Sequence, residues 1–459
     1  FSSIYFNFRE CFFIFGAYIE VLSQCKLNFD QMLLEFSVAN FRSFYSKRTF
    51  TLQGSTSISD IPENISKTMG YNVLRTAAIY GANSSGKTNF VRALASMGNI
   101  ITESAKLNYN EELDPYDPFL LMKNTEKEPT YYEIIFIENN IRYRYGFEHN
   151  LQRIVGEWLF IKKGRKKEEV LFIRNEEGIG ISENDFKEGI DLEEKTNDNR
   201  LFISVVAQLG GTISKLIVEW FSTKCNAISG IHSKSYMGYS KEMFHTKLNG
   251  HNEALNFLQN LKLGFESLST IENEFDPSTL PTELSEKLKK ELTKQLANKK
   301  VVELLSIHKK YDKNGVVIGE IPFDVYEKES EGTQKLIDLS GPIFDTLING
   351  DTLFIDELDC RMHPIISEFI VKLFNDKETN PNNAQLIFTT HDTHLLSSKI
   401  FRRDQIWFAE KDSMQQTDLY TLNDIILPNG QKPRNDSNYE KNYIAGRYGA
   451  IPFLMNYNL

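Results

Sequence analysis

The residues best suited to chemistry form a glycine-rich loop with the pattern Gly-x-x-x-x-Gly-Lys-Thr. An apolar run at 74–80 precedes the loop, and apolar residues with helical spacing follow it over 88–97. In a strand–loop–helix context, backbone N–H groups converge on a phosphate at the helix N-terminus. Lys87 can then reach the β- and γ-phosphates of ATP, and Thr88 can bind Mg²⁺. The predicted ATP-binding loop therefore consists of Gly81, Ala82, Asn83, Ser84, Ser85, Gly86, Lys87 and Thr88.

Two adjacent carboxylates follow a short apolar strand predicted over 352–356. Asp356 would emerge at the carboxyl end of this strand, the edge at which open α/β sheets bind ligands. We expect Asp356 to hold the magnesium directly or through water, and Glu357 to act as general base on the attacking water. The alternative is a buried strand that simply ends in solvated acids.

A histidine and a serine complete the set of candidate site residues. His391 follows the apolar run 386–389, and it can hydrogen-bond the γ-phosphate or the water, although a helix cap is the alternative. Ser330 and Gly332 precede a helix predicted from about Lys335, where open N–H groups make a second anion site. An ordinary helix N-cap is the alternative for this serine.

Composition limits the classes of protein that fit. The 459 residues are enough for two or three domains, and the formal net charge of −10 argues against a surface that is basic throughout and coats nucleic acid. A local basic face stays open, notably the turn 161–167, for which a solvated hairpin tip is the simpler interpretation. The four cysteines are widely spaced, which favours a reduced, cytoplasmic setting over disulfides or zinc: Cys11, Cys25, Cys225 and Cys360.

The apolar and polar patterns predict an α/β fold in several segments. Residues 1–31 hold an apolar run too short to span a bilayer, and we expect them to be a non-native or upstream extension, with a docked N-terminal extension as the alternative. Residues 32–200 should form an ATPase lobe with the phosphate loop and an antiparallel sheet of hairpins. We expect a mostly helical insertion over 201–325 and a second ATPase lobe over 326–459.

The order of these motifs resembles that of ABC-type ATPase heads. The phosphate loop, Ser330-Glu331-Gly332-Thr333-Gln334, Asp356-Glu357-Leu358-Asp359 and His391 match the family's loop, signature, magnesium strand with D-loop, and switch histidine. Asn40-Phe41-Arg42-Ser43-Phe44 looks like the same group. The signature variant, His363-Pro364 and the terminal Gly446–Pro452 segment resemble the SMC-like and OLD-related AAA-family ATPases of prokaryotic anti-phage defence, most nearly the ATPase subunit of PARIS-type systems.

This resemblance implies an ABC-type P-loop head that uses ATP and Mg²⁺. Two copies would enclose the nucleotide, with Ser330 of one copy facing the γ-phosphate held by Lys87 of the other. Asp359 would communicate across that interface, and an isolated monomer would hydrolyse ATP slowly. The family's Q-loop glutamine has no clear counterpart, and Gln208 is the one candidate.

Two classes of function remain open. In the first, the chain is a sensor or scaffold ATPase of an anti-phage complex: a homo-oligomer that controls a separate effector, such as a nuclease, and responds to a phage-encoded trigger. In the second, it is a RecF-like or SMC-like ATPase that clamps DNA during repair. The acidic charge and the lack of a long coiled-coil pattern favour the first class. A self-contained nuclease toxin is a third interpretation, and no membrane partner is expected.

Overall fold

The computed structural model describes residues 31–232, 234–277, 285–296 and 300–452. The structure divides into two compact units. The first unit holds the chain up to His232 and again from Thr346, and the second holds residues 233–345. Apart from Gln31, the predicted extension 1–31 lies outside the described residues.

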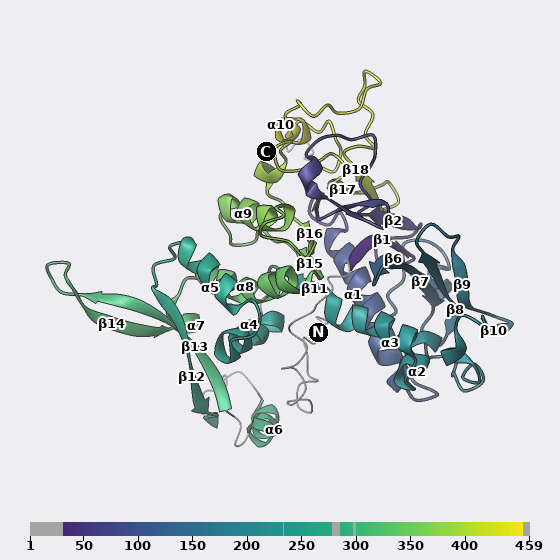
Figure 1. Cartoon of the computed structure of the whole chain (residues 1–459), viewed down its shortest axis with the longest axis horizontal. Helices are drawn as coiled ribbons and strands as arrows, with labels where there is room; N and C mark the ends of the chain where they lie inside the picture. The colour runs from purple at the N-terminus through teal and green to yellow at the C-terminus, as the bar shows by residue number, and fades with distance from the viewer. Residues whose placement is uncertain (1–30, 233, 278–284, 297–299, 453–459) are drawn as a thin grey trace, which may run out of the picture. The chain divides into compact units, whose positions relative to one another are not determined.

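A parallel sheet forms the centre of the first unit (Figure 1). Its strand order is β11-β15-β16-β5-β17-β18, and every neighbouring pair is parallel except β17 and β18. Strands β5, β15 and β16 are buried at every position, which explains their nearly continuous apolar sequences. The strands are β5 (Thr76–Tyr80), β11 (Cys225–Ser229), β15 (Thr352–Asp356), β16 (Gln385–Thr389), β17 (Ile406–Lys411) and β18 (Thr417–Thr421).

An antiparallel sheet of seven strands forms a second layer of this unit, in the order β10-β9-β8-β7-β6-β1-β2. Successive hairpins connect β6 through β10, as the alternating sequence pattern predicts. β1 joins the sheet between β2 and β6. The strands are β1 (Met32–Ala39), β2 (Arg48–Thr51), β6 (Thr130–Glu138), β7 (Ile141–His149), β8 (Ile154–Lys163), β9 (Glu169–Asn175) and β10 (Gly178–Ile181).

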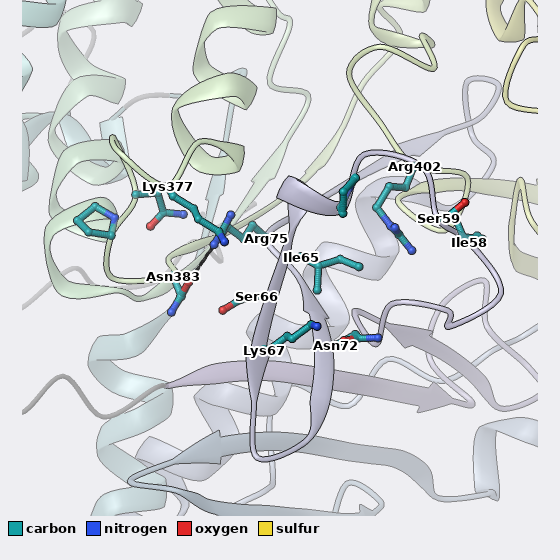
Figure 2. A pocket seen from close by; sticks show the side chains of 13 residues that line it. Ile58, Ser59, Ile65, Ser66, Lys67, Asn72, Arg75, Lys377, Asn383 and Arg402 are labelled. Atoms are coloured by element: carbon teal, nitrogen blue, oxygen red, sulfur yellow. Dashed lines mark hydrogen bonds between the residues drawn. The ribbon is translucent and has the colours of Figure 1, made fainter.

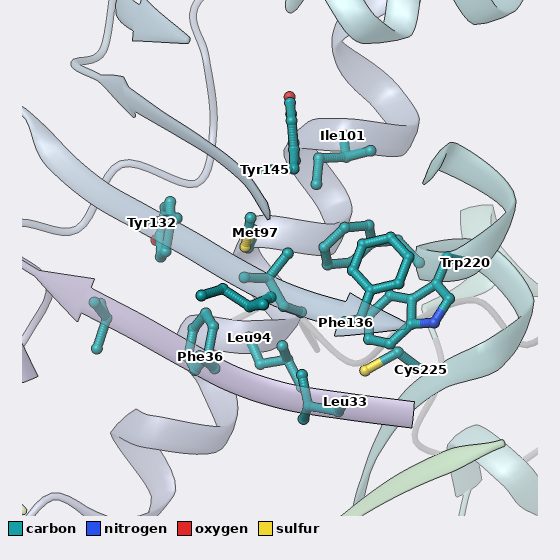
Figure 3. Packing of buried hydrophobic residues seen from close by; sticks show 14 of the residues in the cluster. Leu33, Phe36, Leu94, Met97, Ile101, Tyr132, Phe136, Tyr145, Trp220 and Cys225 are labelled. Atoms are coloured by element: carbon teal, nitrogen blue, oxygen red, sulfur yellow. The ribbon is translucent and has the colours of Figure 1, made fainter. Parts of the chain in front are cut away.

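Helix α1 (Lys87–Glu103) packs against both sheets and carries the core of the unit. The ring of Phe90 lies 5.6 Å from that of Phe36 on β1 and 6.3 Å from that of Phe354 on β15. Figure 3 shows Leu94 and Met97 of the same helix among the side chains of the antiparallel sheet. Each fully buried apolar side chain of this kind contributes about 2 kcal/mol to folding. The N-terminus of α1 is therefore held by two layers at once.

Smaller elements complete the first unit. The hydroxyl of Ser204 on α2 donates a 2.6 Å hydrogen bond to the carbonyl of Ile101, so α2 lies beside the C-terminal end of α1. Trp220 stacks on Phe136 at 4.4 Å, which ties the segment before β11 to the antiparallel sheet (Figure 3). These elements are the β3–β4 hairpin (Ile65–Thr68 and Tyr71–Leu74), α2 (Phe202–Gln208), α3 (Thr212–Glu219), the π-helix η5 (Trp220–Lys224), α9 (Pro364–Asn375) and α10 (Tyr439–Ile444).

The second unit combines helices with a three-stranded antiparallel sheet, β12-β13-β14. Helix α4 packs on β12 and β13, and the rings of Phe257 on α5 and Phe344 on α8 lie 5.4 Å apart. The elements are α4 (Lys234–Thr246), α5 (His251–Asn260), β12 (Ser267–Glu274), α6 (Glu286–Leu296), β13 (Lys300–Tyr311), β14 (Val317–Asp324), α7 (Val325–Lys328) and α8 (Glu331–Asn349), whose last residues belong to the first unit.

The predicted α/β fold with an antiparallel β subdomain is confirmed, but the segment 201–325 differs from the expected helical insertion. Its first part, with α2, α3 and β11, belongs to the first unit, and β11 extends the parallel sheet. Strands β12 to β14 occupy much of its remainder. β12 and β14 are largely exposed, so their sequences lack the clean apolar alternation that identifies a strand. Residues 55–72, expected as loop, contain β3 and the start of β4.

Candidate nucleotide-binding site

The glycine-rich loop connects the buried strand β5 to α1. Gly86 precedes the helix with φ of +109°, and no side chain caps the helix N-terminus. The first N–H groups of a helix have no intrahelical acceptor, so they are available to an anion. The ammonium group of Lys87 donates to the carbonyls of Gly81 and Ala82 at 2.7 and 3.1 Å. The lysine thus lies folded over the loop that a phosphate would enter.

A small hydrogen-bonded cluster supports this loop from behind. The hydroxyl of Thr417 on β18 lies 2.8 Å from both the carbonyl oxygen of Ser85 and the hydroxyl of Ser43. Asn89 on α1 donates to the same Ser43 hydroxyl at 2.9 Å. A Cβ on Gly86 would stand 2.1 Å from the Thr417 hydroxyl oxygen, so only glycine fits. The Asn40–Phe44 motif was indicated by resemblance alone, and in the structure its residue Ser43 helps to support the glycine-rich loop.

The strand register brings the two predicted acidic residues to the same edge as the loop. Ile355 pairs with Phe388, and Thr389 pairs with Ile79, so β15, β16 and β5 end side by side. Asp356 is buried at the end of β15, whereas Glu357 is half-buried and has φ of +58°. A non-glycine residue with this left-handed backbone conformation is uncommon and often marks a functional site.

Nearby carboxylates act electrostatically on Lys87 and His391. Burial lowers the pKa of Lys87, and the carboxylates of Asp356, Glu357 and Asp359 act in the opposite direction. Burial and the charge of Lys87 lower the pKa of His391, and the same carboxylates oppose that shift. The backbone N–H of His391 points to both carboxylate oxygens of Asp359 at 3.3 Å. The structure therefore brings these five residues together.

The donor set fits a nucleotide-bound magnesium better than an independent metal site. Among the described residues, no group of three or more His, Cys, Asp or Glu side chains is arranged to hold a metal ion. Magnesium in nucleotide sites takes one or two protein ligands and completes its shell with phosphates and water. Asp356 and the half-buried Thr88 in the first turn of α1 could supply those ligands, and the ion would neutralise phosphate charge.

Sequence reasoning missed two parts of this edge. Thr389 ends the apolar run before His391, and nothing in the sequence indicates its role. β11 lies in the segment predicted to be mostly helical, yet it ends beside Asp356, and the N–H of Gly230 donates to the Asp356 carbonyl at 2.6 Å. A Cβ at this glycine would stand 2.0 Å from the carbonyl oxygen of Glu357, so the close approach requires glycine. The short run Cys225–Ser229 followed by glycine was the one available signal.

Gln208 does not lie where a Q-loop residue is needed. It is exposed at the end of α2, and α2 packs beside Ile101 near the C-terminal end of α1. Lys87 and Ile101 are about 21 Å apart along the helix at a rise of 1.5 Å per residue. The position next to the site is instead occupied by the end of β11, which leads from the first unit to the second.

Ser330 and Gly332 belong to the second unit, at the start of α8. The Ser330 side chain is exposed, accepts the backbone N–H of Thr333 at 3.2 Å and lies 3.0 Å from the Thr333 hydroxyl. Ser330 therefore is an N-cap, the alternative raised by the sequence, and its exposure leaves it open to contact with another molecule.

The predicted basic turn can also be located. The basic turn lies at the tip of the β8–β9 hairpin, and its residues Arg165, Lys166 and Lys167 are exposed.

Within the described residues, no single helix has the length and hydropathy needed to cross a membrane. The helical segments Phe202–Gln208 and Thr212–Lys224 together have the required length and hydropathy, but they are bent by 109° relative to each other.

Known proteins provide an independent comparison. The family described as "AAA domain, putative AbiEii toxin, Type IV TA system" matches residues 77–397. No curated protein matches the chain. Two solved structures are similar over 85% of this chain and 98% of their own. One is the SMC head domain from Thermotoga maritima, at 12% identity and TM-score 0.37, and the other is RecF with ATP from the RecFOR pathway, at 15% and 0.36.

The family match contains the phosphate loop, both acidic residues and His391, and it spans more than half of the 459 residues. The fold around them is that of an ABC-type P-loop ATPase head, as predicted, with a parallel sheet, a phosphate loop after β5 and an antiparallel β subdomain. The chain belongs to the AAA-domain family of putative AbiEii toxins of type IV toxin–antitoxin systems.

Proposed function

We propose that this chain is an ATP-hydrolysing switch of a prokaryotic anti-phage complex, which assembles through its ATP-bound heads and controls a separate effector. The observation that carries the ATPase part is the convergence of Lys87, Asp356, Glu357 and His391 at the carboxyl edge of one sheet. The family description, which names a putative toxin, supports a defence setting.

Hydrolysis follows from the chemistry of these groups. Lys87 would leave the loop carbonyls for the β- and γ-phosphates, while the N–H groups of α1 bind phosphate oxygens. Glu357 would accept a proton from the attacking water, and His391 would orient that water or the γ-phosphate. Asp356 and Thr88 would hold the magnesium.

The proposed switch requires a second copy of the chain. Ser330 is exposed at a helix N-terminus, a position suited to a γ-phosphate held by another molecule. Each nucleotide would then be enclosed by the phosphate loop of one copy and the signature of the other. In this arrangement ATP binding favours assembly of the copies, and ATP hydrolysis allows them to separate.

Glu357→Gln tests the proposal, because it removes the general base but keeps the shape of the side chain. With ATP and magnesium, we expect this variant to form a stable oligomer by light scattering and to retain the protein encoded by the adjacent gene on purification. Lys87→Ala is the control that should not assemble. An unaltered oligomeric state in Glu357→Gln would contradict the switch.

The second candidate is a DNA-repair ATPase that clamps DNA, which the exposed basic turn after β8 favours. Strong stimulation of ATP hydrolysis by duplex DNA would support this candidate over the first. Cleavage of nucleic acid by the purified chain alone would support the self-contained toxin. Neither outcome is expected if a separate effector carries the chemistry.

A further inference from the structure

A large pocket lies at the opposite end of β5 from the phosphate loop (Figure 2). Its volume is about 870 Å³, and it is formed by the β3–β4 hairpin, the segment between α9 and β16, and residues around Arg402. Arg75 lines the pocket and directly precedes β5, whereas Gly81 directly follows that strand. At about 3.3 Å per residue, the two sites are roughly 20 Å apart.

The lining of this pocket is cationic. It contains Lys67, Arg75, Lys377 and Arg402, and no Asp or Glu. Asp404 neutralises Arg402 with two hydrogen bonds of 3.0 and 2.9 Å. The other three cations form no ion pair within the described part of the chain. Among the side chains that line the pocket, positive charge therefore exceeds negative charge.

Arg75 is the most informative of these residues because its side chain is only 2% exposed. Its guanidinium donates to the carbonyls of Glu63 and Asn375 at 2.8 and 3.0 Å and to the amide oxygen of Asn383 at 3.3 Å. All these acceptors are neutral, and the negative charge that acts on Arg75 is that of the exposed Asp376. A buried charge is normally paired with an opposite one, so this arrangement suits an anionic ligand.

The surroundings favour a small anion over an extended polyanion. Several lining residues have exposed acidic residues as their sequence neighbours: Glu63 follows Pro62, and Asp376 and Glu378 flank Lys377. These acids would repel a nucleic acid backbone that ran across the surface. Of the charged side chains, a compact phosphate inside the pocket would meet only the cations.

The rest of the lining can hold an organic group beside a phosphate. Ile58 and Ile65 supply apolar surface, and Ser66 and Asn72 supply a hydroxyl and an amide (Figure 2). The volume lies within the range of sites that enclose a ligand of drug or nucleotide size, about 300–1,000 Å³. An inorganic ion alone would leave most of it unfilled.

We propose that this pocket is a second binding site, for a nucleoside phosphate, separate from the phosphate loop. Lys67 and Lys377 bind the phosphate, the buried charge of Arg75 attracts it, and the base or sugar lies against the apolar and amide side chains. The inference does not depend on the switch function proposed above.

Equilibrium dialysis of the Lys87→Ala chain tests this proposal, because that variant weakens binding at the phosphate loop. The probes are the mono- and triphosphates of adenosine, guanosine, cytidine and uridine. We expect at least one to bind, and Lys67→Ala/Lys377→Ala in the same background to weaken its binding at least about tenfold. Both lysines are exposed, so their replacement should not disturb the fold.

Lys123→Ala/Lys127→Ala is the matched control. It removes two exposed lysines from the same unit, outside the pocket, and should leave nucleotide binding unchanged. The proposal is overturned if no probe binds below about 1 mM, or if both double variants bind equally well. Tighter binding of a single-stranded oligonucleotide through Lys67 and Lys377 would also overturn it, since the site would then belong to nucleic acid.

Discussion

The hydroxyl of Thr389 donates a 2.8 Å hydrogen bond to the carboxylate of Asp356. The same oxygen accepts the backbone N–H of Glu357 at 2.7 Å, so one side chain on β16 orients both acidic residues at the end of β15. Groups that hold metal ligands in place often matter nearly as much as the ligands themselves. The predicted magnesium ligand and the predicted general base are thus coupled through a residue that itself contacts neither phosphate nor water in the proposed mechanism.

Thr389→Val removes this hydrogen bond while keeping the shape of the side chain. We expect the magnesium-dependent rate of ATP hydrolysis to fall about 10- to 100-fold, as for other residues that position metal ligands. Steady-state phosphate release as a function of magnesium concentration measures the effect.

Thr352→Val is the matched control for that experiment. Thr352 is buried at the opposite end of β15 and donates a 3.2 Å hydrogen bond to Gln385. Thr352→Val should lower the stability of the fold by a comparable amount without slowing ATP hydrolysis. Equal rates in both variants would mean that Thr389 has only a structural role.

Gly86→Ala should abolish ATP binding. The residue has φ of +109°, and an added Cβ would meet the Thr417 hydroxyl at 2.1 Å, so the loop and β18 would have to separate. Gly70→Ala isolates the cost of the backbone conformation, because Gly70 has φ of +84° and nothing within 4 Å of the added carbon. We expect Gly70→Ala to cost about 1 kcal/mol and to bind ATP normally by calorimetry. Equal ATP affinity in both variants would contradict the steric argument.

The sequence could predict those site residues that lie at or just after the end of a buried strand. β15 and β16 have the bounds expected from their apolar runs, and strand register then brings Asp356, Glu357 and His391 to one edge. The roles of these residues remain predictions. Thr389 could not be found in this way, because its function depends on a neighbouring strand that is 33 residues away in the sequence.

The second unit was harder to predict for a different reason. β12 and β14 are mostly exposed, so neither face of these strands is strongly apolar. Without that alternation, their sequences do not distinguish a strand from a helix or a loop. β11 was missed because five residues are too few for a period to appear, and the polar Asn226 interrupts its apolar character.

Protonation of His149 should weaken the fold in mild acid. The ring is fully buried against Tyr132, and burial lowers its pKa from 6.5 to about 4. The unfolded chain therefore binds a proton that the folded chain excludes. Stability present above pH 6.5 is lost as the pH falls toward 4. From about pH 7.5 to about pH 5, His149 should account for a loss of about 2 kcal/mol.

His149→Phe provides the comparison, because phenylalanine keeps the stacked ring and cannot bind a proton. Urea denaturation at the two pH values should show a smaller acid-induced loss of stability in the variant by about that amount. Other titrating groups are common to both proteins and cancel in the difference. An identical loss in both would show that the ring is not kept neutral by burial.

Two inactive variants should restore activity to each other if each nucleotide is enclosed by two copies of the chain. Ser330→Asp keeps the N-cap, because aspartate accepts the same N–H of Thr333, but it places a negative charge where the γ-phosphate is proposed to lie. We expect this variant to melt like the natural chain and to lack ATPase activity, as does Lys87→Ala. Ser330→Asn keeps the cap without the charge and should retain more activity.

An equal mixture of Ser330→Asp and Lys87→Ala then distinguishes a shared site from a self-contained one. In a mixed dimer, one site carries both changes and the other carries neither. If half of the dimers are mixed, about a quarter of all sites are intact, and ATPase activity should recover to about a quarter of the natural rate. If each copy completed its own site, no mixed dimer would contain an intact one, and the mixture would stay as inactive as its components.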